Sequence, residues 1–236
     1  ANPSLSMTLE NAHTVTTLRY RPNSDPNTLL KEFIIQNEKG KKFEGRIEEY
    51  FKLLSRIMPE ILKYEFFIET RNTFPHSAGI ASSASAFSAL SLCILSWYNN
   101  IKPDTLDHED FKRKASNFAR LGSGSASRSV YGKYALWGKS DDIHGSSDEY
   151  ATPLNHEISN DFLQLKDSIL VVNSGMKKVS SSEGHNTMKD HPFAHARYQQ
   201  AHKNLQKILL AMKENNWKAF GEIVEKLETI MRSFLS

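Results

Sequence analysis

Residues 119–132 read ARLGSGSASRSVYG, and this stretch decides how the rest of the chain is interpreted. Glycine and serine alternate from Gly122 to Ser125, and an arginine follows at Arg128. Backbone N–H groups and hydroxyls suit phosphate oxygens, and a guanidinium binds phosphate or carboxylate through two parallel hydrogen bonds. A flexible linker is the alternative, but linkers rarely carry Leu, Arg, Val and Tyr at helical spacing. The stretch therefore predicts an anion-binding turn.

The composition around this stretch is ordinary for a soluble globular protein. The chain has 236 residues, 39% of them hydrophobic and 24% charged, which suffices for one large domain or two small ones. A net charge of +3 gives little support for a nucleic-acid partner. The single cysteine, Cys93, cannot form an internal disulfide, which predicts a reducing, cytoplasmic setting. No membrane span and no signal peptide are visible.

Hydrophobic periodicity predicts a mixture of strands and helices. Two short strands are expected within residues 4–18, paired with each other. Further strands are expected at 31–35, 64–71, 131–137, 150–154 and 168–172. Helices are expected at 45–57, from 82 to 97, from the Asp107 cap through 119, from Pro192, and at 217–234. Because strands and helices do not alternate strictly, the pattern favours an α+β fold. A polar connector at residues 155–161 predicts two domains, 1–158 and 159–236.

Three turns are rich in glycine and serine: Gly79–Ser83, Gly122–Ser125 and Ser180–Gly184. The first two lie next to helices with many small and apolar residues, where backbone N–H groups face an anion. Three such turns predict a site for more than one phosphorylated group, a nucleotide and a phosphorylated substrate. Neither the Walker pattern nor the dinucleotide-binding fingerprint occurs in the sequence.

Several motifs resemble one family. PHSAGIASSASAFSAL at residues 75–90 resembles the phosphate-binding motif of the GHMP kinase superfamily, in the form found in diphosphomevalonate decarboxylases. ARLGSGSASRSVYGKYALW at 119–137 is similar to that family's Gly-Ser-Gly-Ser-Ala-Cys/Ser-Arg-Ser block. SLSMTL, SSDEYATPL and ILVVN…KKVSSSEGH, at residues 4–9, 146–154 and 169–185, resemble the family in order and spacing. The resemblance spans residues 4 to about 197.

The resemblance implies a GHMP-kinase-type fold with the ligand cleft between two domains. The N-terminal domain would be ribosomal S5 domain 2-like, and the C-terminal domain would be an incomplete ferredoxin-like one. The implied activity is the ATP- and Mg²⁺-dependent decarboxylation of mevalonate 5-diphosphate to isopentenyl diphosphate, in a cytoplasmic homodimer. Two alternatives stay open: a mevalonate or phosphomevalonate kinase of the same superfamily, and a non-catalytic protein that binds a phosphorylated metabolite.

The resemblance also implies roles for particular residues. The nucleotide phosphates, with magnesium, would lie on the first turn, at Ala78, Gly79, Ala81, Ser82 and Ser83. The substrate would be held by Ser123, Gly124, Ser125, Ser180 and Ser181, and Arg128 would pair with its anionic groups during catalysis. The alternatives are that Ser82 and Ser83 only cap a helix and that Arg128 is a surface residue tied to an acid.

The sequence departs from the family at several places. Family members carry an upstream segment with a substrate-binding Lys and Tyr, and a C-terminal Asp-Ala-Gly-Pro-Asn block whose Asp is the proposed base. Neither occurs here, and the chain lacks an initiator Met, so we expect a piece of a longer protein. His76, His185 and the pair Asp190–His191 replace the usual residues. These substitutions leave the number of phosphates on the substrate open.

Overall fold

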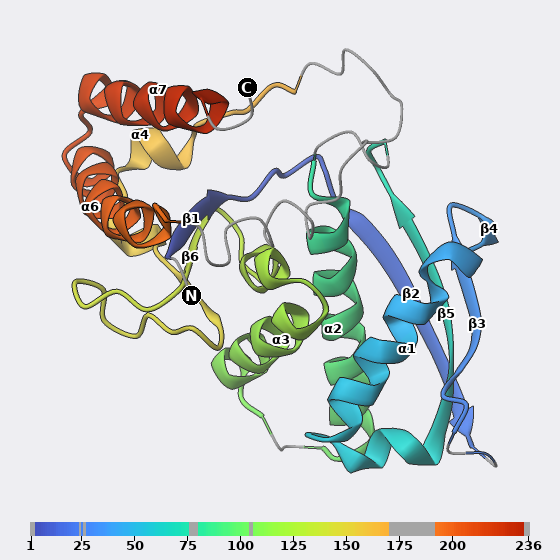
Figure 1. Cartoon of the computed structure of the whole chain (residues 1–236). Helices are drawn as coiled ribbons and strands as arrows, with labels where there is room; N and C mark the ends of the chain where they lie inside the picture. Colours follow the sequence, from blue (N-terminus) through green and yellow to red (C-terminus); the bar gives the residue numbers. More distant parts are fainter. Residues whose placement is uncertain are drawn as a thin grey trace.

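Two sheets and the helices packed on them organise the chain (Figure 1). The computed structural model describes residues 3–23, 25, 27–75, 80–103, 106–169 and 192–233. Mixed helices and sheets confirm the expected α+β class. Across the described residues, no helix combines the length and apolar character that crossing a membrane requires.

The larger sheet has the strand order β2-β5-β3-β4. Its strands are β2 (Thr14–Pro22), β3 (Leu30–Ile35), β4 (Glu38–Lys39) and β5 (Tyr64–Asn72). β5 pairs antiparallel with β2 and parallel with β3. The parallel pair requires a crossover, which α1 (Lys41–Ser55) and the short 3-10 helix η1 (Pro59–Lys63) supply. The expected end of the first helix before Pro59 is confirmed.

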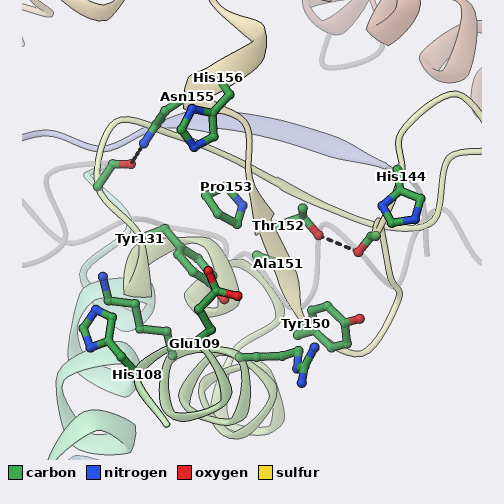
Figure 2. Close-up of a pocket in the computed structure, with 14 residues that line it drawn as sticks. His108, Glu109, Tyr131, His144, Tyr150, Ala151, Thr152, Pro153, Asn155 and His156 are labelled. Atoms are coloured by element: carbon green, nitrogen blue, oxygen red, sulfur yellow. Dashed lines mark hydrogen bonds between the residues drawn. The ribbon is translucent and has the colours of Figure 1, made fainter.

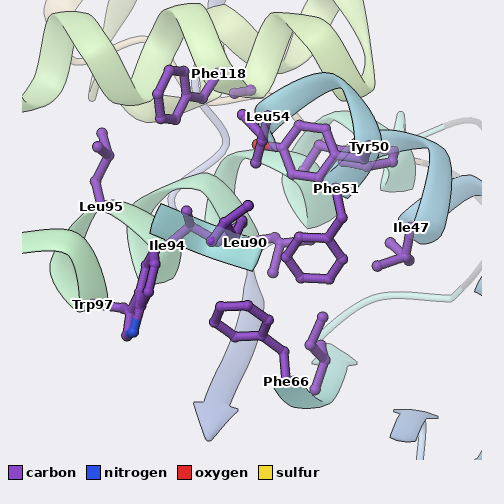
Figure 3. Packing of buried hydrophobic residues seen from close by; sticks show 14 of the residues in the cluster. Ile47, Tyr50, Phe51, Leu54, Phe66, Leu90, Ile94, Leu95, Trp97 and Phe118 are labelled. Carbon is purple, nitrogen blue, oxygen red and sulfur yellow. The ribbon is translucent and has the colours of Figure 1, made fainter. Parts of the chain in front are cut away.

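Two helices cover one face of this sheet, and a third packs on those two to enclose the main core (Figure 3). They are α1, α2 (Ser82–Ile101) and α3 (His108–Gly122). The ring of Phe51 from α1 stacks on Phe66 from β5 at 5.1 Å between centroids, and Trp97 from α2 meets Phe66 edge-on. α3 begins where the sequence predicts, because the Asp107 carboxylate accepts a hydrogen bond from the Asp110 N–H at 2.7 Å.

The smaller sheet has the order β1-β6-β7 and a core of its own. Its strands are β1 (Ser4–Met7), β6 (Tyr134–Trp137) and β7 (Ala151–Pro153), followed by the 3-10 helix η3 (Asn155–Glu157). The helices α4 (Asn160–Leu163), α6 (Ala194–Lys213) and α7 (Trp217–Ser233) come next in the chain. Phe162, fully buried, stacks on Trp217 at 3.9 Å.

The expected pairing of the first two strands with each other is wrong. β1 pairs with β6, and β2 pairs with β5 over nine residues. The physical reason is that the two strands face different cores: Leu5 and Met7 pack against the second cluster, whereas Leu18 packs against the first. Residues 168–169 are not in a strand, and the rest of the strand expected at 168–172 lies outside the described residues.

The boundary expected between residues 158 and 159 falls inside the second core. Ile158 lies before it, Leu205 and Met212 lie after it, and all three belong to one buried cluster with Tyr134 and Leu136. The C-terminal helices therefore share a core with the strands of the N-terminal part. The division into domains 1–158 and 159–236 stays a prediction.

We predict that Phe162→Ala lowers the free energy of unfolding by about 3–5 kcal/mol, because a fully buried ring leaves a cavity behind. Urea unfolding followed by tryptophan fluorescence measures this directly, since Trp217 stacks on the ring. Leu210→Ala is the control: Leu210 is exposed on α6, so its loss should cost no more than about 0.5 kcal/mol. If Phe162→Ala and Leu210→Ala lowered the free energy of unfolding equally, Phe162 would not be a core residue of the second cluster.

Candidate functional site

At the start of α2, hydrogen-bond donors have no partner among the described residues and are available to a ligand. Ala81 caps the helix in the left-handed conformation, at φ 51° and ψ 47°. Its carbonyl accepts from the N–H of Ala84 at 2.8 Å, so the N–H groups of Ser82 and Ser83 precede the first helical bond. The alternative that these serines cap the helix is wrong, because Ala81 is the cap and no side chain bonds there. The first turn therefore presents two N–H groups at the positive end of the helix dipole.

The second predicted turn lies at the junction of α3 with the 3-10 helix η2 (Gly124–Val130). Ser123 is extended between the two helices, Gly124 and Ser125 open η2, and Arg128 lies in its last turn. Ser127 donates to the Gly124 carbonyl at 2.8 Å, which fixes the turn.

Both glycines of this turn are required by packing, a role that the sequence interpretation missed. A Cβ on Gly122 would lie 2.1 Å from the ring of Phe87 in α2, and one on Gly124 would lie 2.7 Å from Trp137 in β6. α2 packs against both α3 and η2. The contact of Gly122 with Phe87, five residues after Ser82, brings the first two turns of α2 next to the junction.

The serines of the region divide into two kinds. The Ser116 hydroxyl donates to the Ser127 carbonyl and accepts from the Ala151 N–H, both at 2.8 Å, so it holds α3, η2 and β7 together. In contrast, four predicted site serines have hydroxyls without a hydrogen-bond partner among the described residues, and all four are half-buried: Ser82, Ser83, Ser123 and Ser125. Half-buried hydroxyls without partners are available to a ligand.

Arg128 carries a positive charge into this region, where no carboxylate of the described residues pairs with it. Its Nη1 donates to the Ser4 hydroxyl and, at 3.4 Å, to the Ser4 carbonyl. Its Nε is buried without a hydrogen-bond partner in the described part of the chain. Burial lowers the pKa of the guanidinium, since the charged form loses its hydration. No ion pair joins it to an acid among the described residues, so the alternative of a surface arginine tied to an acid is not what the structure shows.

Ser4 is a site residue that the sequence did not single out. β1 pairs with β6 so that Ser4 lies opposite Trp137, the side chain that covers Gly124. This pairing brings the first strand of the chain to the guanidinium of Arg128, 124 positions further on. The sequence could not indicate this contact between Ser4 and Arg128, because it depends on the long-range pairing of β1 with β6.

Some predicted site residues cannot be placed in this arrangement. Ala78, Gly79, Ser180 and Ser181 lie outside the described residues, as do His76 and His185. Among the residues that are described, no three His, Cys, Asp or Glu side chains are grouped to hold a metal ion. A magnesium ion held by phosphates and hydroxyl oxygens needs no such cluster, and Ser82 and Ser83 offer suitable oxygens.

A cavity of about 510 Å³ lies at the other end of α3 (Figure 2). His108 and Lys112 from α3, Tyr131, Tyr150 and Thr152 are among its lining residues. None of the predicted site residues that the structure describes lines it. The cavity is therefore separate from the two serine-bearing turns.

Comparisons with known proteins identify the family. Residues 1–151 match the model of the diphosphomevalonate decarboxylase-like N-terminal domain. Diphosphomevalonate decarboxylase of Saccharomyces cerevisiae is 32% identical over 193 residues, which cover 78% of this chain and 46% of that protein. The chain thus spans about half the length of this curated relative.

Solved structures agree in fold. Mevalonate diphosphate decarboxylase from Staphylococcus aureus is 31% identical with a TM-score of 0.70, over 95% of this chain and 63% of that one. A structure described as MDDEF in complex with MVAPP, AMPPCP and magnesium is 28% identical with a TM-score of 0.68, over 95% of this chain and 64% of that one. These matches confirm the expected GHMP-kinase-type fold.

We predict that Gly122→Ala lowers the free energy of unfolding by about 1–3 kcal/mol, because the new methyl group overlaps the ring of Phe87. Chemical denaturation measures the change. Gly132→Ala is the matched control, since a Cβ there meets nothing within 4 Å. Combining Gly122→Ala with Phe87→Leu should restore part of the loss. A Gly122→Ala protein as stable as the control would rule out the packing role.

Proposed function

The chain belongs to the diphosphomevalonate decarboxylase-like family, and we propose that it binds ATP and mevalonate 5-diphosphate for the ATP-dependent decarboxylation that yields isopentenyl diphosphate. In this reaction the γ-phosphoryl group of ATP passes to the tertiary hydroxyl of the substrate, giving ADP. Phosphate then leaves, and carbon dioxide is lost as the double bond forms. Phosphoryl transfer needs positioning and charge neutralisation more than covalent help from the protein.

The observation that carries the proposal is the guanidinium of Arg128. A buried positive charge is costly unless an anion pairs with it, and no carboxylate of the described residues does so. The substrate supplies both a diphosphate and a carboxylate. Ser123 and Ser125, with free hydroxyls on the same short segment, are placed to bind further oxygens of such an anion. Ser4 holds the guanidinium by one nitrogen, and Nε is a buried donor without a partner among the described residues.

The start of α2 supports the nucleotide part of the proposal. The N–H groups of Ser82 and Ser83 lie at the positive end of the helix dipole, and their hydroxyls are on the same turn, an arrangement that suits phosphate oxygens. Magnesium, bound through those phosphates, would neutralise charge on the transferred group. We assign Ala78 and Gly79 to the same phosphates and Ser180 and Ser181 to the substrate, as the resemblance implies.

The proposal assigns binding and orientation to this chain and leaves the proton-accepting group unassigned. A dry, preorganised pocket assists the loss of carbon dioxide once phosphate departure makes the tertiary carbon electron-deficient. The cytoplasmic location and the homodimer that the resemblance implies belong to the same proposal and stay predictions.

We predict that Arg128→Met weakens binding of mevalonate 5-diphosphate by about 10- to 100-fold, since charge-assisted hydrogen bonds to the anion are lost. The free energy of unfolding should change by no more than about 1 kcal/mol, because a buried charge is replaced by an apolar chain of similar length. Calorimetric titration and urea unfolding measure the two effects.

The matched control is Arg19→Met, which removes an exposed arginine paired with Glu32 at 3.6 Å. It should leave the affinity for mevalonate 5-diphosphate unchanged. If Arg128→Met lost stability and affinity in equal measure, or if both variants bound alike, Arg128 would be a structural residue and the proposed function would lose its main support.

A second titration separates the proposed reaction from the kinase alternative. Mevalonate, mevalonate 5-phosphate and mevalonate 5-diphosphate are compared on the same protein with an ATP analogue and Mg²⁺ present. We expect the diphosphate to bind most tightly, with each phosphate adding about tenfold. Tighter binding of mevalonate or its monophosphate would instead favour a kinase of the same superfamily.

A further inference from the structure

The cavity of about 510 Å³ at the start of α3 has the size of a small-molecule site. It lies at the opposite end of the 15-residue α3 from Gly122, about 20 Å away along the helix. Its walls come from the first turns of α3, from Tyr131 and Gly132 after η2, and from the segment around β7. Nothing in the proposed decarboxylation uses these residues.

The walls are held in place by hydrogen bonds, as Figure 2 shows. The Asn155 amide donates to the Gly132 carbonyl at 3.4 Å, and the Thr152 hydroxyl donates to the Gly145 carbonyl at 2.9 Å. Behind them, the N–H of the buried Ala151 donates to Ser116 of α3 at 2.8 Å. The cavity is thus formed before any ligand enters.

Lys112 supplies the cavity with a cation that is available to a ligand. Lys112 is half-buried, and its ammonium group has no ion pair or hydrogen bond within the part of the chain that the structure describes. His108 lies four residues earlier, hence on the same face of α3, and also lines the cavity. By contrast, the neighbouring Arg113 is engaged by Asp110 and by the ring of Tyr150, 5.8 Å away. Lys112 and His108 therefore form a pair of donors at the positive end of the α3 dipole.

The remaining lining groups suit a flat, hydroxyl-bearing molecule. The rings of Tyr131 and Tyr150 are half-buried on two walls of the cavity. Burial raises the pKa of Tyr131 to about 12 despite the opposing charge of Arg113, so the phenol stays neutral. Glu109 also lines the cavity, near enough to Tyr131 to raise its pKa, and its carboxylate has no ion pair among the described residues.

From this arrangement we infer that the cavity is a second binding site, for a nucleoside monophosphate. The phosphate binds Lys112 and His108, the ribose hydroxyls donate to Glu109, and the base packs on the tyrosine rings. A metal ion does not fit, because the histidines around the cavity are not grouped as metal ligands in the described residues. The inference goes beyond the proposed function and does not depend on it.

The test follows AMP binding by NMR of the histidine side chains, because His108, His144 and His156 all line the cavity. We expect AMP to shift these signals at saturation, and Lys112→Gln to weaken its affinity by about tenfold through loss of a charge-assisted hydrogen bond. Lys114→Gln is the matched control: it removes the same charge from the same helix, but Lys114 lies over the rings of Tyr98 and Phe118.

Three outcomes would overturn the inference. The histidine signals would stay unmoved up to about 10 mM AMP, a concentration that detects even millimolar binding. Alternatively, Lys112→Gln and Lys114→Gln would weaken the binding equally. Finally, inorganic phosphate would bind as tightly as AMP, which would leave the nucleoside without a role. Binding of AMP that leaves the histidine signals unmoved reports on the proposed nucleotide site at Ser82 and Ser83 and counts as the first outcome.

Discussion

The close approach of Gly122 to the ring of Phe87 is the constraint on which the rest of the structure depends. It lets the end of α3 lie directly on the first turns of α2, where any side chain would force the helices apart. The first two turns of α2, which begins at Ser82, lie next to the junction at Ser123 for that reason. Gly122 therefore has a packing role besides its place in the predicted anion-binding turn: it sets the distance between α3 and α2.

The charge of Arg128 then determines which kind of ligand the region favours. Arg128 is half-buried, is held through one nitrogen by Ser4, and forms no ion pair with an acid in the described part of the chain. Such a charge favours an external anion, and the free hydroxyls around it supply further bonds. The cavity at the other end of α3 has a similar feature, because Lys112 has no ion pair or hydrogen bond within the described residues.

Local patterns predicted the parts of the fold that local physics determines. The long helices follow from apolar periodicity, and the start of α3 follows from the Asp107 cap. The pairing of β1 with β6 could not be predicted, because two short alternating strands carry no signal for which core they face. For the same reason the sequence indicated Arg128 as a site residue but not Ser4. The cavity escaped notice because its lining comes from segments that share no motif.

The most direct measurement of the central claim observes the Arg128 guanidinium itself. In ¹⁵N-labelled protein, its Nε–H signal is assigned by comparison with Arg128→Lys and followed while mevalonate 5-diphosphate is added. If the buried Nε is held for the substrate, the signal shifts strongly downfield and its exchange with water slows as the anion binds. An Nε–H signal that does not move while the ligand saturates the protein would contradict the account.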